Sequence, residues 1–432
     1  MKRLSYMLLF AIAIASCERN DYTGEAIKDE AIDYEAEPMP VLISLGDAPM
    51  IESKGYGTFG DLTGQQRLDS IVWSSAEFYI YSFSKSQDCD MRINWSDSTN
   101  TAGSICLIDA TRHDSATDGR GKKAKFNTAD FKMLDWVEKP DSIIYYNTQD
   151  YYKSYDFFAY HIDDCPVSKI DRQRDYIDID IEFDGTQDIM GGKAALTDAQ
   201  ITAINSKSNR DELLDNYYST FSANHEISPY IRMNHYLTKV RFELYPGGDL
   251  TERGDSSACF EAYVRDISIS SFGKATMTVA SHDEAQYPLQ LQFMEDSQRN
   301  MHLKDLYIDD NGNIADSIQF KRLDYNESDV AITDPYMRQP QAIGDYLLVA
   351  PAEQMTVNII MFNDRNDVHY GEEPFHITLT PPDGTESFEA GKGYVVKLAI
   401  YGFQQIEAQI DIEPWVDGGS INIDPDDEIN NY

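Results

Sequence analysis

The stretch G-K-G-Y-V-V-K-L-A-I-Y-G-F-Q-Q-I-E-A-Q-I-D-I-E-P-W, at Gly391 to Trp415, carries the clearest fold signal in the chain. Tyr394 to Ile400 is rich in β-branched and aromatic residues, which favour strands. Apolar and polar residues then alternate from Gln405 to Glu413, and a period of two puts each kind on its own strand face. The predicted apolar face consists of Ile406, Ala408, Ile410 and Ile412. The stretch therefore predicts two consecutive strands, closed by Pro414 and Trp415.

Similar strand patterns recur along the chain at short intervals. The strongest are Phe78 to Phe83, Tyr155 to His161, Ile177 to Phe183, Val240 to Leu244 and Val264 to Ser270. Shorter ones are Ile71 to Trp73, Ile105 to Ile108, the segment at Trp136, Ile143 to Tyr146, Tyr346 to Val349, Val357 to Phe362 and His376 to Leu379. Short strands with frequent turn signals and few helices are typical of β-sandwiches. We therefore predict an all-β protein.

The chain length predicts two domains. A chain of 432 residues is too long for one ordinary core, and 42% hydrophobic residues are enough to build two. A second run of strands begins near Ile231, so we place one β-sandwich domain at 38–230 and the other at 231–432.

Few segments have a helical pattern. Short helices are expected only between Thr197 and Phe221, where Asn209 and Glu212 have the spacing of a capping box before Leu213. Trp95 to Lys125 is polar and predicts long loops around the strand at Ile105 to Ile108.

The N-terminus has the pattern of a bacterial lipoprotein signal. Lys2 and Arg3 precede an apolar run from Leu4 to Ala15, and small residues come directly before Cys17. Residues 1–16 are therefore predicted to be removed, leaving a diacylated Cys17 as the first residue and the lipid as the membrane anchor. Residues 17–37 are acidic and predict a solvated tether.

A short strand is predicted directly after this tether. Pro38 and Pro40 stiffen the chain before Val41, Leu42, Ile43, Ser44 and Leu45, in which apolar residues alternate. A lone basic residue follows at Lys54, before Gly55, and is a candidate proteolytic site.

Charge and cysteine spacing exclude several function classes. The net charge of −38 makes nucleic acid an improbable partner, because a phosphate backbone would be repelled. The cysteines after Cys17 form no C-x-x-C pair, which argues against a zinc or thioredoxin-like site. Buried free thiols are expected at Cys89, Cys106, Cys165 and Cys259.

No catalytic, metal or cofactor site is predicted. Asp309, Asn311 and Asn313 begin like a calcium loop, but Ile314 and Phe320 stand where glycine and glutamate are needed, so a hairpin turn at Asn311-Gly312 is favoured. His235 is interpreted as a structural residue at a strand start. The tryptophans at 73, 95 and 136 could form a sugar-stacking platform, but core packing is favoured.

These features together resemble the fimbrillin-like lipoproteins that build the type V pili of Bacteroidetes. Four places carry the resemblance: the lipobox with its strand and basic residue, Y-D-F-F-A-Y at Tyr155 to Tyr160, R-M-N-H-Y-L-T-K-V-R-F-E-L at Arg232 to Leu244, and Gly391 to Trp415. The last is the most specific, since it combines a turn, two strands and a terminal Pro-Trp.

The resemblance implies two transthyretin-like β-sandwich domains in tandem and a location at the outer membrane. In this family a protease removes the lipidated N-terminal segment with its first strand, and a strand of the neighbouring subunit fills the groove. The matching first strand here is Val41 to Leu45, and Lys54 stands where the family has a cleaved arginine. The implied partners are other pilus subunits, with host or bacterial surface ligands.

Several alternatives remain open at this stage. Only Ser420 to Ile423 looks extended after Trp415, whereas stalk subunits of the family carry a longer donor extension, so stalk, tip and anchor roles all stand. A monomeric glycan-binding lipoprotein of a polysaccharide-uptake system is the second hypothesis. An enzyme is the third, since a carboxylate pair cannot be recognised from sequence.

Overall fold

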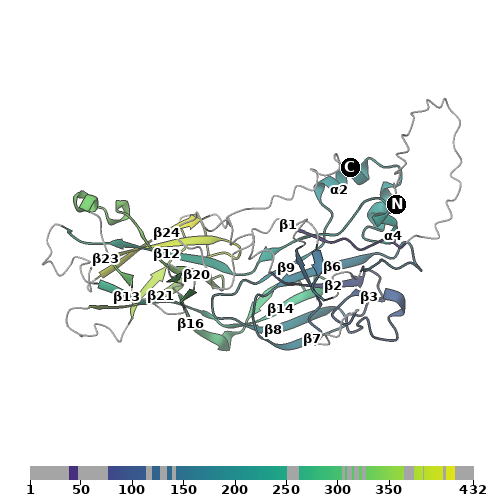
Figure 1. The fold of residues 1–432 in the computed structure, drawn as a ribbon, viewed down its shortest axis with the longest axis horizontal. Coiled ribbons are helices and arrows are strands. Elements are labelled where there is room, and N and C mark those ends of the chain that lie inside the picture. Colours follow the sequence, from purple (N-terminus) through teal and green to yellow (C-terminus); the bar gives the residue numbers. More distant parts are fainter. Residues whose placement is uncertain are drawn as a thin grey trace, which may run out of the picture. The chain divides into compact units, whose positions relative to one another are not determined.

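A computed structural model of the chain describes residues 38–46, 76–112, 119–126, 134–138, 143–250, 262–303, 307–308, 314–315, 321–323, 327–363, 374–382, 384–401 and 405–413. These residues form β-strands in several sheets, with three short helices, so the all-β prediction is confirmed (Figure 1). None of the helices in these ranges is long and apolar enough to cross a membrane.

The first sandwich consists of two facing sheets. The β2–β6 sheet has the order β11 (Asn234–His235), β9 (Met190–Lys193), β6 (Tyr155–His161), β2 (Phe78–Ser84), β4 (Lys122–Phe126) and β5 (Leu134–Trp136), and β3 (Cys106–Ile108) also pairs with β2. The β8–β14 sheet has the order β15 (Leu291–Phe293), β14 (Lys274–Ser281), β8 (Tyr176–Glu182) and β7 (Val167–Arg172).

The central strands β2 and β6 are buried on both faces. Tyr81 and Phe158 belong to the hydrophobic cluster shared with the β8–β14 sheet. Phe78 and Phe157 belong to a second cluster on the opposite face. This is why neither strand shows the apolar–polar alternation of a half-exposed strand. Strand β8, with one face outward, does alternate, since Ile177, Ile179 and Ile181 are buried and the acidic residues between them are not.

The second sandwich also consists of two facing sheets. The β12–β23 sheet has the order β20 (Gln341–Val349), β12 (Thr238–Pro246), β23 (Gly393–Tyr401) and β24 (Gln405–Glu413). The β13–β21 sheet has the order β16 (Gln298–His302), β13 (Ala262–Phe272), β21 (Met355–Asn363) and β22 (Phe375–Leu379), and β19 (Lys321–Arg322) pairs with β13. Phe242 and Val396 from one sheet and Ile269 and Val357 from the other belong to one buried cluster.

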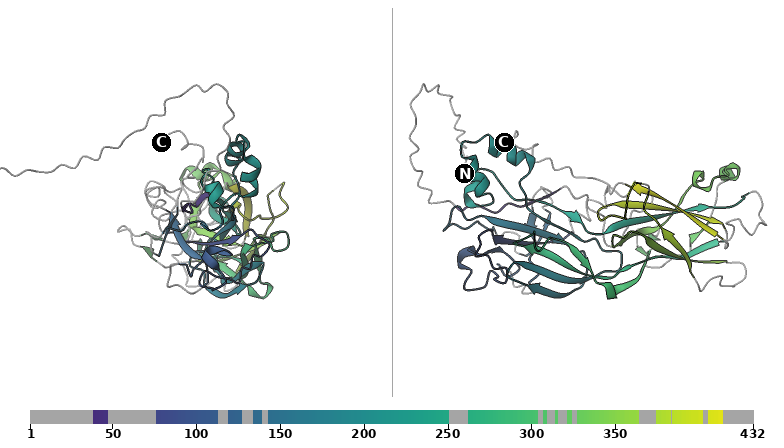
Figure 2. Two further views of the ribbon diagram at one scale, coloured as in Figure 1. Left: turned by 90° about the vertical axis from the view of Figure 1, so that its right-hand side faces the viewer. Right: turned by 180° about the vertical axis from the view of Figure 1, so that it is seen from behind.

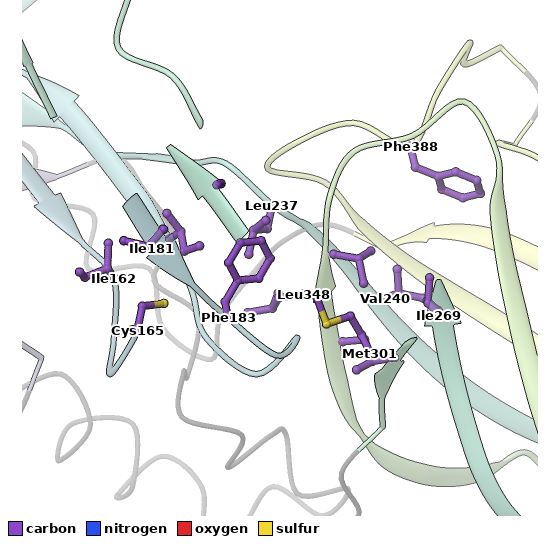
Figure 3. Packing of buried hydrophobic residues seen from close by; sticks show 14 of the residues in the cluster. Ile162, Cys165, Ile181, Phe183, Leu237, Val240, Ile269, Met301, Leu348 and Phe388 are labelled. Atoms are coloured by element: carbon purple, nitrogen blue, oxygen red, sulfur yellow. The ribbon is translucent and has the colours of Figure 1, made fainter. Parts of the chain in front are cut away.

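This cluster continues into the first sandwich, as Figure 3 shows for Phe183, Leu237 and Leu348. Gly185 lies at the junction, where its carbonyl oxygen accepts a 2.8 Å hydrogen bond from Leu348 N–H. Its φ of +96° and its closeness to Met301 make a side chain unfavourable there. Strand β14, which follows β13 in the chain, pairs with β8, so the β8–β14 sheet contains strands from both sides of residue 231.

The helices cover the face of the β2–β6 sheet that is turned away from β7 and β8 (Figure 2). They are α2 (Asp198–Asn205), α3 (Arg210–Asp215) and α4 (Thr220–Ala223), and the 3₁₀ turns are η1 (Thr101–Gly103), η2 (Glu295–Ser297), η3 (Glu327–Ala331) and η4 (Pro335–Met337). The predicted capping box at Asn209 is wrong, because this side chain makes no cap hydrogen bond and instead lies 3.2 Å from the His225 ring. The observed capping boxes begin at Thr197 and Ser219.

Two other local predictions need correction. Strand β4 overlaps the end of the stretch predicted as loops. The prediction missed this strand because its lysines obscure the apolar–polar alternation of a strand. Lys122 is itself buried, and its ammonium group donates to the Arg112 carbonyl oxygen. Ile143 to Tyr146 forms a single backbone bridge at Tyr145 rather than a regular strand.

The other local predictions have mixed outcomes. The hairpin is confirmed by antiparallel pairing of β17 (Tyr307–Ile308) with β18 (Ile314–Ala315), although its turn residues lie outside the described ranges. Buried free thiols are confirmed at Cys89, Cys106 and Cys165. Cys259, Ile71 to Trp73 and Pro414-Trp415 lie outside the described residues.

Strand β8 offers a direct test of which face holds the core. Replacing the fully buried side chain in Ile179→Ala should lower the free energy of unfolding by about 2–5 kcal/mol, through lost burial and a residual cavity. Partial burial raises the pKa of the neighbouring Asp178, with repulsion from Asp171 and Asp180 adding to it and a hydrogen bond with Thr278 opposing it. Asp178→Asn is therefore the control and should cause no comparable loss in urea denaturation. Equal losses in the two variants would contradict the assigned faces.

Candidate functional site

Residues 38–46, the first-strand segment, lie between two other parts of the chain. On one side Val41 N–H donates to the Ile144 carbonyl oxygen at 2.7 Å, and Tyr146 N–H donates to the Met39 carbonyl oxygen at 3.0 Å. These bonds flank an antiparallel bridge between Pro40 and Tyr145. The segment is therefore held by its backbone and is not a detached tether.

The other side of the segment forms a short parallel ladder. Strand β1 (Ser44–Gly46) pairs with β10 (Tyr230–Arg232), and Ser44 N–H donates to the Pro229 carbonyl oxygen at 3.1 Å. Strand β10 in turn lies close to β9, where a Cβ on Gly192 would clash with the Arg232 carbonyl oxygen. The ladder is only three residue pairs long, so the backbone holds the segment through few bonds.

Alternate side chains of the segment point into the protein. Val41, Ile43 and Leu45 are 8%, 3% and 2% exposed, whereas Leu42 is 45% exposed. The three buried side chains belong to the cluster that covers the outer face of the β2–β6 sheet, together with Ile144 and Ile231. The predicted alternation therefore holds, and the apolar face of the segment fills a groove in the sandwich.

Helix α4 and the loop before β6 form the neighbouring wall of this groove. Thr220 Oγ1 donates to the Asn147 carbonyl oxygen at 2.9 Å, and Phe221 N–H donates to the Tyr151 carbonyl oxygen at 3.0 Å. Beside the segment lies a cavity of about 270 Å³, lined by Met39, Pro40, Leu42, Tyr146, Ala223, Glu226, Ile227 and Ser228. The N-terminal end of the segment is thus less tightly packed than Ile43 and Leu45.

A chain of buried polar groups lies just beyond β10. His235 Nδ1 is 3.0 Å from the carboxylate of the fully buried Asp188, whose N–H donates to Asp163 Oδ2 at 2.8 Å. His161 Nε2 lies 3.0 Å from Asp163 Oδ1, and its Nδ1 lies 2.8 Å from the Glu77 carbonyl oxygen. These contacts tie the ends of β6, β9 and β11 to the residue before β2.

The carboxylates in this group of buried polar residues change the pKa of His161. Burial alone lowers the pKa of His161, but the Asp163 carboxylate outweighs it, and the pKa is raised to about 9. The pKa of Lys85, which is half-buried, shifts in the opposite direction. Burial lowers the pKa of Lys85 to about 7, although Asp156 at 4.0 Å partly offsets this. His235 is buried and bonded to a carboxylate, in keeping with a structural role.

The predicted site residues fall into two groups. Val41, Leu42, Ile43, Ser44 and Leu45 are together in the first-strand segment. Cys17, Lys54 and Gly55 lie outside the described residues, as do the acidic tether and the Asp309–Asn313 turn. Within the described ranges no group of three His, Cys, Asp or Glu side chains is arranged to hold a metal ion. Sequence reasoning missed the Asp163–Asp188 link, since nothing in the local pattern marks those aspartates.

The described tryptophans are occupied by packing. Trp136 is buried, and the guanidinium carbon of Arg112 lies 3.7 Å from the centre of the Trp95 ring. Trp73 lies outside the described residues. Trp95 and Trp136 therefore do not support the alternative of a sugar-stacking platform.

Comparisons with known proteins give matches only to solved structures. No protein-family model matches the chain. No curated protein matches it either. A candidate cell adhesion protein from Bacteroides uniformis shares 12% identity, with 88% of this chain and 98% of that one covered and a TM-score of 0.44.

Two further matches are of the same kind. A candidate cell adhesion protein from Bacteroides ovatus shares 9% identity, covers 89% and 100% of the two chains and has a TM-score of 0.40. The fimbrial anchor protein Mfa2 from Porphyromonas gingivalis shares 10% identity, covers 87% and 98%, and has a TM-score of 0.33. Likeness at this level carries no conclusion about what this chain does.

The seating of the segment can be tested with two neighbouring substitutions. Ile43→Asp should place an unpaired charge in the groove and expel the segment, because burying an isolated carboxylate is costly. Amide exchange should then accelerate at residues 144–146 and 230–232. Leu42→Asp, at an exposed position of the same segment, is the matched control and should leave exchange there unchanged. Similar exchange in both variants would show that residues 41–45 are not inserted as described.

The raised pKa of His161 makes stability depend on pH. The histidine binds its proton more tightly when folded, so its stabilisation is complete below about pH 6.5, the ordinary histidine pKa, and is lost as the pH rises through about 9. The free energy of unfolding should therefore fall by roughly 1–3 kcal/mol across this window. His161→Gln should be less stable at pH 6.5 and lack this fall. A wild-type fall that persists in the variant would assign it to another group.

Proposed function

We propose that this chain is a fimbrillin-like subunit of a cell-surface pilus, assembled by exchange of its first strand and serving adhesion. The observation that carries the proposal is the seating of Val41, Ile43 and Leu45. They fill an apolar groove, yet the backbone of the segment is held by short ladders only. A strand of this kind can be replaced by another strand with the same alternation.

The energetics explain why a vacated groove would be refilled. Each of the three side chains contributes about 1.5–3 kcal/mol by burial, or roughly 5–9 kcal/mol together. That sum is comparable to the whole stability of an ordinary domain. Removal of the segment would also leave backbone groups of 144–146 and 229–232 unpaired, which is a template for strand addition.

The remaining parts of the proposal come from the sequence. Cys17 is the lipid attachment site that delivers the chain to the outer membrane, and cleavage after Lys54 makes Gly55 the new terminus. The partners are other pilus subunits, with host or bacterial surface ligands. The position in the pilus is stalk, tip or anchor, and the proposal includes no enzymatic activity.

Mass spectrometry of the protein from intact cells tests the processing step. The expected product begins at Gly55, because strand exchange requires loss of the anchored segment. Lys54→Gln should abolish that terminus and leave a diacylated Cys17 peptide, whereas Lys54→Arg, which keeps the positive charge, is the control for cleavage.

The same experiment separates the alternatives. A wild-type protein found only with lipidated Cys17 would contradict strand exchange and indicate a subunit fixed to the membrane. Uncut monomers that bind immobilised polysaccharide would favour the glycan-binding lipoprotein instead.

A further inference from the structure

The second sandwich has an open groove between β22 and β24. Within the described residues these are the last strands of their sheets, and each pairs with a single neighbour. The groove has a volume of about 570 Å³ and is lined by residues 378–382, which include the end of β22, and by Ala408, Ile410, Asp411 and Ile412 of β24. It lies at the edge of the sandwich where the two sheets face one another.

The side of β24 that faces this groove is apolar and only partly covered, since Ile410 is half-buried against the core cluster while its neighbours on the same face are exposed. Ile412, Ile410 and Ala408 pair with Tyr394, Val396 and Leu398, all of which are buried, so the β24 residues lie on the core side of the sheet. Ile412 is nevertheless 51% exposed, and Ala408 is also exposed. The neighbouring strand β23 is almost fully buried. An apolar strip on the core side of an edge strand indicates a surface that another segment covers.

We propose that the chain's own C-terminal segment, Ser420 to Ile423, covers this strip as an additional strand. Strand β24 ends at Glu413, directly beyond Ile412, so the chain leaves the sheet at the groove itself. Residues 414–432 lie outside the described part. The six residues 414–419 can span about 20 Å when extended, which exceeds the ~10 Å between packed sheets.

The composition of this segment suits the groove. Gly418 and Gly419 allow a sharp reversal of the chain. In S-I-N-I, Ile421 and Ile423 would face Ile410 and Ile412, while Asn422 would face solvent. The acidic run after Ile423 (D-P-D-D-E) would end the covered part, because buried carboxylates without partners are unfavourable. This inference concerns the second sandwich and does not depend on cleavage at Lys54.

Hydrogen–deuterium exchange of the full chain tests the covering segment. The double variant Ile421→Asp, Ile423→Asp should accelerate exchange at 378–382 and 408–412 by about tenfold, since the added strand and its burial are lost. Asn422→Asp, at the outward position, is the matched control and should leave this exchange unchanged. Exchange in β6 serves as the internal reference for an intact fold.

Two results would overturn the proposal. Unchanged exchange at 378–382 and 408–412 in the double variant would show that this segment does not cover the groove. Protection that disappears on about 100-fold dilution, together with a dimer-to-monomer transition in sedimentation, would assign the cover to a second copy of the chain. Protection that is independent of concentration is the result expected for the chain's own tail.

Discussion

The β2–β6 sheet has two apolar faces, and covering both of them is the constraint on which the first part of the molecule depends. Tyr81 and Phe158 on one face require the β8–β14 sheet. Phe78 and Phe157 on the other require a separate cover, which the helices and the first-strand segment supply. Because the segment fills part of a buried face, its removal or replacement would change the stability of the whole sandwich.

The polar groups at the ends of these buried strands must also find hydrogen-bond partners inside the protein, because they are shielded from water. His161, Asp163, Asp188 and His235 are withdrawn from water and are linked to one another by hydrogen bonds of 2.8–3.0 Å. Elsewhere, directly after β2, burial lowers the pKa of Lys85, and the nearby Asp156 only partly offsets this shift. The strand ends are therefore joined by buried polar groups, and removing one partner would leave the other unpaired and destabilise the fold.

Particular residues show how far sequence reasoning reached. The strands at Tyr155–His161 and Gln405–Glu413 follow from local composition and period, and both have the predicted extent. The alternation of Val41, Ile43 and Leu45 predicted which side chains are buried. Prediction failed at β4, where lysines conceal a strand, and at Asn209, where the cap geometry depends on a contact with His225. Burial and caps of this kind depend on residues distant in the chain.

The sequence by itself determined the all-β class, the position of most strands and the inward face of each alternating one, because the period of two is a property of the extended backbone. Only the tertiary structure decided which strands remote from one another in sequence pair. The partnership of β14 with β8 and of β1 with β10 joins segments remote in sequence, and the alternation of one strand does not specify its neighbour. For the same reason the apolar face of β24 was predictable, whereas its exposure became visible only once the opposite sheet was seen to end at β22.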